Sequence, residues 1–243
     1  MISFRPLPAL TVAAGLLFAF LVWLGVWQLE RLQWKLALIA QVNANMAAPA
    51  IPASEALRLG VDGAQYRHVK LHGHFDNSKE VFALATQEGE PVYHVLVPFE
   101  TEQGVFLVDR GRIPQALKDP QLRKAGLIEG ETDVIGVWRT PDPASSFTPS
   151  PDLKARLWFS RDVMAIAHAD GVNLAAPVVI EADAKPNPGG WPIGGGTMVE
   201  FRNQHFQYAM TWFALAAGLL GVYLAYHVSK GRLRLNRQAS GSN

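Results

Sequence analysis

The chemically richest group of side chains lies at the start of the last apolar segment, where Arg202, His205, Tyr208 and Trp212 follow one another. On a helix, positions 205, 208 and 212 share one face. A neutral imidazole at the edge of an aromatic, low-dielectric environment is a suitable axial ligand for haem iron. The sequence therefore indicates His205 as a candidate haem ligand, and Arg202 could pair with a haem propionate.

A second polar and aromatic group closes the first apolar segment and contains Trp27, Gln28 and Arg31. If both segments cross a membrane, this group lies at the same level as His205, and Arg31 is a second candidate for a propionate. A simpler reading is a belt of interfacial aromatic residues with arginines reaching the surface, as many membrane helices have. An interfacial belt explains the tryptophans and arginines well, but it does not readily explain His205 and Gln28. A lone histidine at such a helix end is also commonly a hydrogen-bonded interface residue, so both readings stay open.

These residues must be positioned by two long apolar segments. Residues 7–29 and 206–229 carry no Asp, Glu, Lys or Arg. The first is about 23 residues long and reaches about 35 Å as a helix, which exceeds a hydrocarbon core of about 30 Å. A cleaved signal peptide is the alternative for it, but Trp27, Gln28, Glu30 and Arg31 make a poor cleavage site. A buried core helix would need a matching core. We predict transmembrane helices at residues 9–29 and 205–228.

Flanking charges predict the orientation of these helices. The tail at residues 229–243 carries Lys230, Arg232, Arg234 and Arg237 and no acid, and the N-terminal residues 1–8 carry Arg5. Because short cytoplasmic flanks are enriched in Lys and Arg, both termini are predicted to be cytoplasmic. Residues 30–204 would then form a periplasmic domain of a multi-pass protein in a bacterial inner membrane. The absence of an Arg- and Ser-rich transit peptide favours a bacterial source.

The composition excludes several classes of function. A formal net charge of +1 argues against a broad nucleic-acid-binding surface, so contact with membrane lipid is expected and contact with nucleic acid is not. The chain has no cysteine, which excludes disulfides, thiolate metal sites and a cysteine nucleophile.

The middle segment is predicted to fold as a β domain. Residues 66–75 alternate, with Val69, Leu71 and Phe75 on one face and histidines on the other. Further strands are expected at residues 80–86, 93–99, 105–109, 133–138 and 178–182. A helix is expected at residues 161–169 with Ser160 as its N-cap, and the first membrane helix is expected to continue through Leu32, Leu36 and Ile39. This order predicts a membrane protein of α+β class: two transmembrane helices flanking an antiparallel sheet or small barrel with one or two short helices.

The domain offers only weak chemical motifs. The run at residues 189–196 lacks the Lys-Ser/Thr ending of a phosphate loop, so a flexible approach to the membrane is the better interpretation. His72 and His74 could share a metal ion with help from a neighbouring strand, although an exposed polar face is the default. GxSxG and HExxH are absent, and no Ser-His-Asp order is recognisable, so no enzyme is predicted. An enzymatic site would need a pocket where acids and histidines converge.

Six segments in a fixed order, with the two-span layout, resemble the Surfeit locus protein 1 family of cytochrome c oxidase assembly factors. They are LGVWQLERLQWKLALI at residues 24–39, YRHVKLHGHFDNSKE at 66–80, FLVDRGRIP at 106–114, IEGETDVIG at 128–136, PGGWPIGG at 188–195 and RNQHFQYAMTWFALA at 202–216. The resemblance covers nearly the whole chain. One departure is Asp109-Arg110-Gly111-Arg112, where the family often has Asn-Arg-Gly and an aromatic residue.

The resemblance implies a non-enzymatic function in the maturation of haem-copper oxidases. It implies that haem a is bound transiently, that His205 is the ligand of the haem iron, and that the haem is passed to oxidase subunit I. Trp27, Gln28, Arg31, Arg202, Tyr208 and Trp212 are the expected surroundings of the haem. Expected partners are subunit I and other oxidase assembly factors, and haem a synthase is a possible further one. The alternative is a haem-free membrane scaffold that holds an oxidase assembly intermediate.

Overall fold

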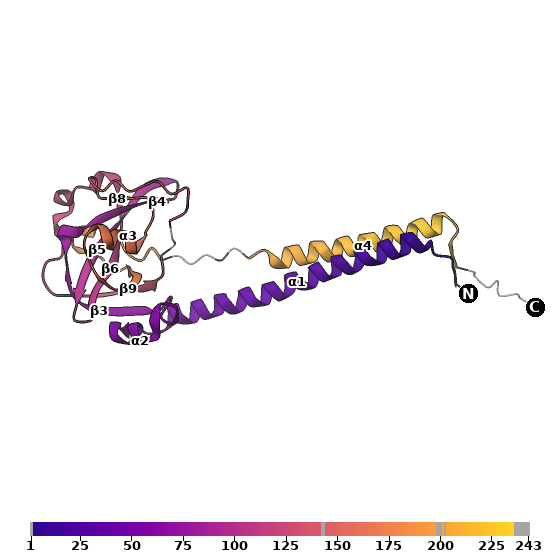
Figure 1. Cartoon of the computed structure of the whole chain (residues 1–243), viewed down its shortest axis with the longest axis horizontal. Helices are drawn as coiled ribbons and strands as arrows, with labels where there is room; N and C mark the ends of the chain where they lie inside the picture. The colour runs from indigo at the N-terminus through magenta and orange to yellow at the C-terminus, as the bar shows by residue number, and fades with distance from the viewer. Residues whose placement is uncertain (1, 142–143, 198–200, 202, 236–243) are drawn as a thin grey trace, which may run out of the picture. The chain divides into compact units, whose positions relative to one another are not determined.

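The structure is a computed structural model that describes residues 2–141, 144–197, 201 and 203–235 (Figure 1). The chain divides into two compact units. One contains residues 1–40 and 200–243, and the other contains residues 41–199. The boundary between them falls within the first helix.

The first unit consists of two long helices, α1 (Pro8–Ala47) up to residue 40 and α4 (His205–Ser229). Both are long and apolar enough to cross a membrane, which confirms the prediction of one such helix near each end. The helix does continue past residue 29, as the sequence predicts. Strands β1 (Ile2–Phe4) and β10 (Leu233–Leu235) pair antiparallel, so both ends of the described chain meet at one end of the helix pair.

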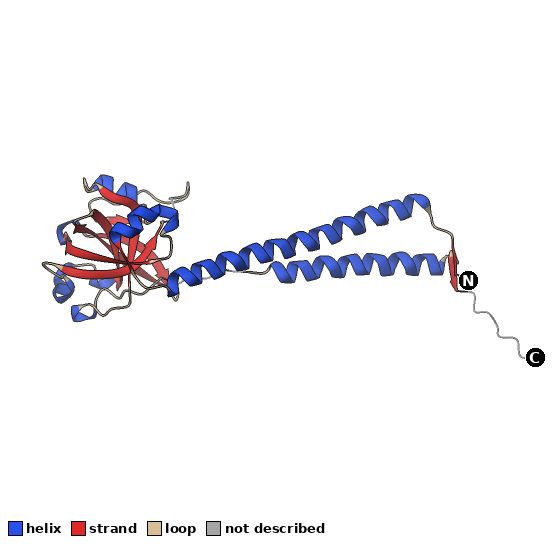
Figure 2. Cartoon of the chain, turned by 90° about the horizontal axis from the view of Figure 1, so that it is seen from below, coloured by secondary structure: helices blue, strands red, loops and turns tan. Residues whose placement is uncertain are grey.

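The second unit is built on a small barrel (Figure 2). Its strands pair in the order β3–β7–β9–β6–β5, and β5 pairs back onto β3 to close the ring. Most pairs are antiparallel, and β6–β9 is parallel. Strand β4 pairs antiparallel with β5, and β8 pairs parallel with β4. The bounds are β3 (His68–Phe75), β4 (Val81–Gln87), β5 (Glu90–Thr101), β6 (Gly104–Pro114), β7 (Thr132–Arg139), β8 (Leu157–Trp158) and β9 (Leu174–Ala182).

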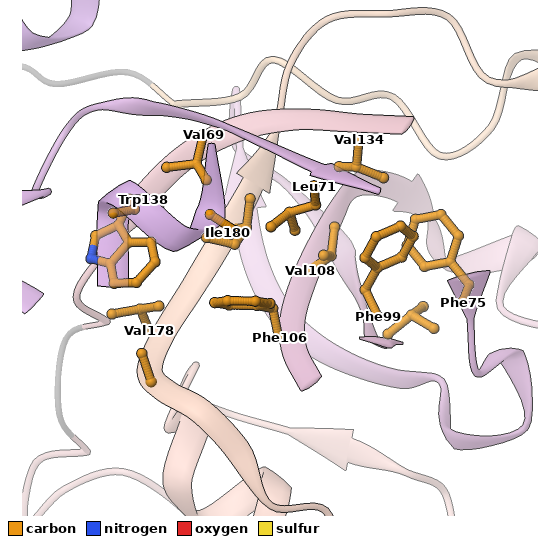
Figure 3. Packing of buried hydrophobic residues seen from close by; sticks show 14 of the residues in the cluster. Val69, Leu71, Phe75, Phe99, Phe106, Val108, Val134, Trp138, Val178 and Ile180 are labelled. Atoms are coloured by element: carbon orange, nitrogen blue, oxygen red, sulfur yellow. The ribbon is translucent and has the colours of Figure 1, made fainter. Parts of the chain in front are cut away.

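The barrel interior is filled by the apolar face of each strand (Figure 3). In β3 the residues alternate as predicted, with Val69, Leu71 and Phe75 buried and Lys70 and the histidines at 72 and 74 exposed. Phe75 and Phe99 meet edge to face, with ring centroids 4.7 Å apart, and Phe106 meets Trp138 in the same way. The predicted class of fold is therefore confirmed.

A second cluster lies beneath helix α3 (Val163–Ala169), which covers the outer faces of Leu96, Leu107 and Val179. The predicted helix at residues 161–169 is present but begins two residues later. Its N-cap is Asp162, whose carboxylate accepts from the amide of Ala165 at 3.0 Å, and not Ser160. Aspartate is as good a cap as serine, and here it stands at the position where the backbone becomes helical.

Helix α2 (Ala53–Gly63) was not predicted from the sequence. It is short and kinked at Gly60, where φ is 78°, and this weakens its helical pattern. Strand β2 (Ile51–Pro52) precedes it and pairs with the start of β3. The indole of Trp138 donates to the carbonyl of Val61 at 3.2 Å, which fixes α2 over one end of the barrel.

The glycine-rich run at residues 189–196 was predicted to be a flexible approach to the membrane, and this is wrong for residues 193–195, which are bound to the barrel backbone. Ile193 exchanges backbone hydrogen bonds with Arg112 at 2.9 and 3.0 Å, and the amide of Gly195 donates to Ala182. A Cβ atom at Gly194 would lie 2.5 Å from the carbonyl oxygen of Asp183. The glycines therefore serve to bring two backbones into contact.

The departure from the family pattern at residues 109–112 lies in a β-bulge. Between the pairs Leu96–Asp109 and His94–Arg112, strand β5 has one residue and β6 has Arg110 and Gly111. Gly111 has a φ of 112°, and a Cβ atom there would lie 2.0 Å from the carbonyl oxygen of Ile193. A bulge bends the strand and redirects its side chains, so Asp109 and Arg110 both become buried.

Candidate functional site

His205 is the first residue of α4 and contacts α1 directly. Its Nδ1 lies 2.8 Å from the side-chain carbonyl oxygen of Gln28. With Gln28 Oε1 as the acceptor, Nδ1 is the donor, and a neutral imidazole then has its lone pair on Nε2. The imidazole is half-buried, so this lone pair is held in a defined orientation and is free to bind a metal ion.

The other residues predicted at this level fall into two groups. Trp212 lies partly buried on α4, and its indole Nε1 is enclosed without a hydrogen-bond partner among the described residues. Trp27 and Tyr208 are 46% and 53% exposed, so they face away from the helix contact. Arg31 is exposed as well, and its guanidinium stacks on Trp34 at 4.0 Å from the ring centroid. Arg202 lies outside the described residues.

The two helices α1 and α4 approach closely at Gly25 and Phe213, about two turns along α4 from His205. Gly25 is buried, and a Cβ atom there would lie 2.5 Å from the ring of Phe213. The absence of a side chain at residue 25 therefore lets the helices come close enough for Gln28, one turn further along α1, to reach His205.

A second polar contact joins the helices near their opposite ends, where the hydroxyls of Thr11 and Tyr223 lie 2.6 Å apart. The 17 residues from Thr11 to Gln28 correspond to about 26 Å of helix, which is close to the thickness of a hydrocarbon core of about 30 Å. If these helices cross a membrane, the Gln28–His205 pair is expected near one of its surfaces.

The domain contains a charged pocket that sequence reasoning missed. Asp109 and Glu181 are buried side by side on the parallel strands β6 and β9. Arg161 donates to both, at 3.4 Å to Asp109 and 2.7 Å to Glu181, and His94 Nδ1 lies 2.8 Å from Asp109. Together with Arg139 and others, these residues line a cavity of about 140 Å³. Four strands and a loop contribute to this cluster, so no local motif could reveal it.

The charges in this pocket determine the protonation of His94. Burial lowers the pKa of His94, but the negative charge of Asp109 and its hydrogen bond to the imidazole together outweigh burial and raise the pKa. The arrangement of acids and a histidine in one pocket is what an enzymatic site would require. The two acids are, however, bound to arginine and histidine, and such a paired network is also a common way to stabilise a fold.

The histidines on β3 are paired with acids. His72 Nδ1 lies 2.8 Å from Asp133, and His74 Nε2 lies 3.3 Å from Glu100. Among the residues that the structure describes, no group of three or more histidine or acidic side chains is arranged to hold a metal ion.

Comparison with known proteins identifies the family. The model of the SURF1 family matches residues 15–217. Surfeit locus protein 1 of human is 36% identical over 212 residues, which cover 80% of this chain and 69% of the human protein. The mouse protein of the same name is 36% identical over 211 residues, with 80% and 68% coverage. A SURF1-like protein of Rickettsia felis is 30% identical over 224 residues, with 86% and 92% coverage. This chain belongs to the SURF1 family.

Proposed function

We propose that this protein is a non-enzymatic assembly factor for a haem-copper oxidase of the cytochrome c type. In this proposal it binds haem a at the membrane–periplasm boundary and helps to insert it into oxidase subunit I. Membership of the SURF1 family supports the role in oxidase assembly. The orientation of His205 by Gln28 is the single observation that carries the haem-binding part.

The residues around His205 fit this cofactor in two respects. The tautomer fixed by Gln28 leaves Nε2 of His205 as a neutral nitrogen ligand, the form that haem iron binds. The enclosed indole N–H of Trp212, two turns along the same helix, is an unsatisfied donor that a bound polar group would satisfy. When bound, haem a would supply an iron centre that an imidazole nitrogen can ligate.

Each residue has a distinct task in this function. His205 binds the iron, and Gln28 holds the imidazole in its tautomer and rotamer. Gly25 lets α1 and α4 approach, and the apolar faces of both helices exclude water from the iron ligand. Arg31 and Arg202 remain the candidates for the propionates. Subunit I, other assembly factors and haem a synthase remain the proposed partners.

The test is the spectrum of the full-length protein purified from cells that make haem a. We expect haem a to co-purify with the parent protein and to be lost from His205→Ala. His227→Ala is the matched control, because His227 lies on the same helix and its Nε2 also has no partner among the described residues. Haem content that is unchanged in His205→Ala, or that depends on His227 instead, would show that the ligand assignment is wrong.

The competing function is a haem-free scaffold for an oxidase intermediate. It predicts that subunit I co-purifies with a protein that carries no haem, and that His205→Ala assembles oxidase as well as the parent does. Oxidase content in the two strains therefore separates the two functions.

A further inference from the structure

Arg110 is a buried cation of the domain that forms no ion pair with an acid among the residues the structure describes. The residue is 2% exposed, and its Nη2 donates to the carbonyl of Gly126 at 2.7 Å and to the side chain of Asn187 at 3.0 Å. Its Nη1 is enclosed and has no hydrogen-bond partner among the described residues. Both of these hydrogen bonds are to neutral oxygens, so they leave the positive charge uncompensated.

Glu80, an acid whose charge acts on Arg110, is already engaged by another arginine. Glu80 is buried and accepts two hydrogen bonds from the guanidinium of Arg123, so its charge is neutralised by that arginine. Burial lowers the pKa of Arg110 to about 10, against the attraction of Glu80, and Arg110 therefore remains charged at neutral pH. An unpaired buried charge is costly, and a bound anion would relieve that cost.

Arg110 lines a cavity of about 310 Å³ whose other walls are largely apolar. This volume is at the lower end of the range for sites that bind small organic molecules. The apolar walls are Phe75, Ile128, Val134, Ile135, Pro186 and Pro188. Phe75 also stacks against the guanidinium, with 4.5 Å between Arg110 Cζ and the ring centroid. A buried guanidinium beside an apolar wall suits an amphiphilic ligand, although Asp133, Asp183 and Lys185 also line the cavity.

The charges around the cavity fit a ligand with a single negative charge. Asp133 and Asp183 line it together with Arg110 and Lys185, and Asp133 is bridged to Lys70 at 2.9 Å. The cations Arg110, Lys185 and Lys70 exceed the two aspartates of this group by one. A monoanion would therefore be balanced, and a dianion would be repelled by the two aspartates.

We propose that this cavity binds a small monocarboxylate with a compact apolar body, whose carboxylate is held by Arg110. Guanidinium–carboxylate hydrogen bonds are charge-assisted and strong, and the apolar body gains from burial against the aromatic and aliphatic walls. The site lies in the unit of residues 41–199 and is independent of the haem-binding function of α1 and α4.

Equilibrium dialysis of the full-length protein in maltoside micelles tests this with labelled benzoate and its neutral isostere benzamide. Empty micelles serve as the background. We expect saturable binding of benzoate to one site per chain and at least tenfold weaker binding of benzamide. Equal binding of the two compounds, or no saturable binding of benzoate, would overturn the proposal.

Two variants locate the site. Arg110→Met should weaken benzoate binding at least tenfold, whereas Arg58→Met, at an exposed arginine of α2, should leave it unchanged. Because Arg110 also holds Gly126 and Asn187, its loss could unfold the domain. Thr132→Trp therefore fills the cavity while Arg110 is retained, and it should abolish binding too. Benzoate binding that persists in folded Arg110→Met or in Thr132→Trp would exclude this site.

Discussion

The contact between His205 and Gln28 shows what a sequence can and cannot say about a single residue. Trp27, Gln28 and Arg31 all lie at the predicted membrane level, but neighbouring residues on a helix point about 100° apart. Trp27 and Gln28 therefore cannot both point at α4, and in the structure Gln28 contacts His205 while Trp27 is exposed. The rotation of one helix about its axis depends on packing against its partner, which residue types at a helix end do not encode.

Gln28→Leu should weaken haem binding without removing the ligand. The substitution takes away the acceptor that fixes the tautomer of His205, and loss of such a partner typically costs tenfold to 100-fold in metal affinity. Titration of haem into the purified protein should show a fall of about tenfold or more. Gln33→Leu, at an exposed position of the same helix, should bind haem as the parent does. Unchanged affinity in Gln28→Leu would contradict the positioning role.

His94 should make the domain less stable as the pH rises. The pKa of His94 is raised in the folded state. Burial lowers this pKa, but the charge of Asp109 and its hydrogen bond to the imidazole outweigh burial. Arg161 also lowers the pKa, and Glu181 raises it. The stabilisation is therefore complete below the unfolded pKa of 6.5 and is lost as the pH rises through the higher folded value. Thermal unfolding of the full-length protein should show this decline as the pH rises above 6.5. His94→Gln cannot titrate and should lack it; an identical pH profile would refute the assignment.

At the scale of elements, alternation along a strand predicted its buried face correctly, whereas irregular backbone could not be predicted. The period of two in residues 68–75 predicted which face of β3 is buried, because one face of a barrel strand must be apolar. The bulge at Arg110 and Gly111 was invisible, because it depends on how many residues β5 places opposite β6. The same bulge positions Asp109 for the charged pocket and Arg110 for the cavity. Because the bulge could not be predicted, neither site could be.

The packing of α1 on α4 at Gly25 should be necessary for haem binding. In Gly25→Leu the new side chain would meet the ring of Phe213, push the helices apart and separate Gln28 from His205. We expect haem content to fall severalfold while both helices stay in the membrane. Gly15→Leu is the matched control on the same helix, because a Cβ atom at Gly15 meets nothing within 4 Å. Equal haem loss in both variants would point to a general effect of leucine on the helix.

At the scale of the whole molecule, the two helices fix the topology more firmly than the charges do. The contacts Thr11–Tyr223 and Gln28–His205 make α1 and α4 antiparallel, and β1 pairs with β10 beside the ends of both. If the helices cross a membrane, both termini therefore lie on one side and the domain on the other. The basic tail decides which side is cytoplasmic, and the domain is then predicted to be periplasmic.

Single-cysteine labelling should establish this orientation, because the chain has no cysteine to remove. Lys154→Cys places a thiol at an exposed position of the domain, and Ser229→Cys places one at the end of α4. In cells with a permeabilised outer membrane, an impermeant maleimide should label Lys154→Cys and spare Ser229→Cys, and lysis should expose both. The reverse pattern would invert the orientation and put the haem ligand at the cytoplasmic surface. Labelling of both sites in unlysed cells would contradict the membrane-spanning arrangement, because His205 and Ser229 could not then lie at opposite surfaces.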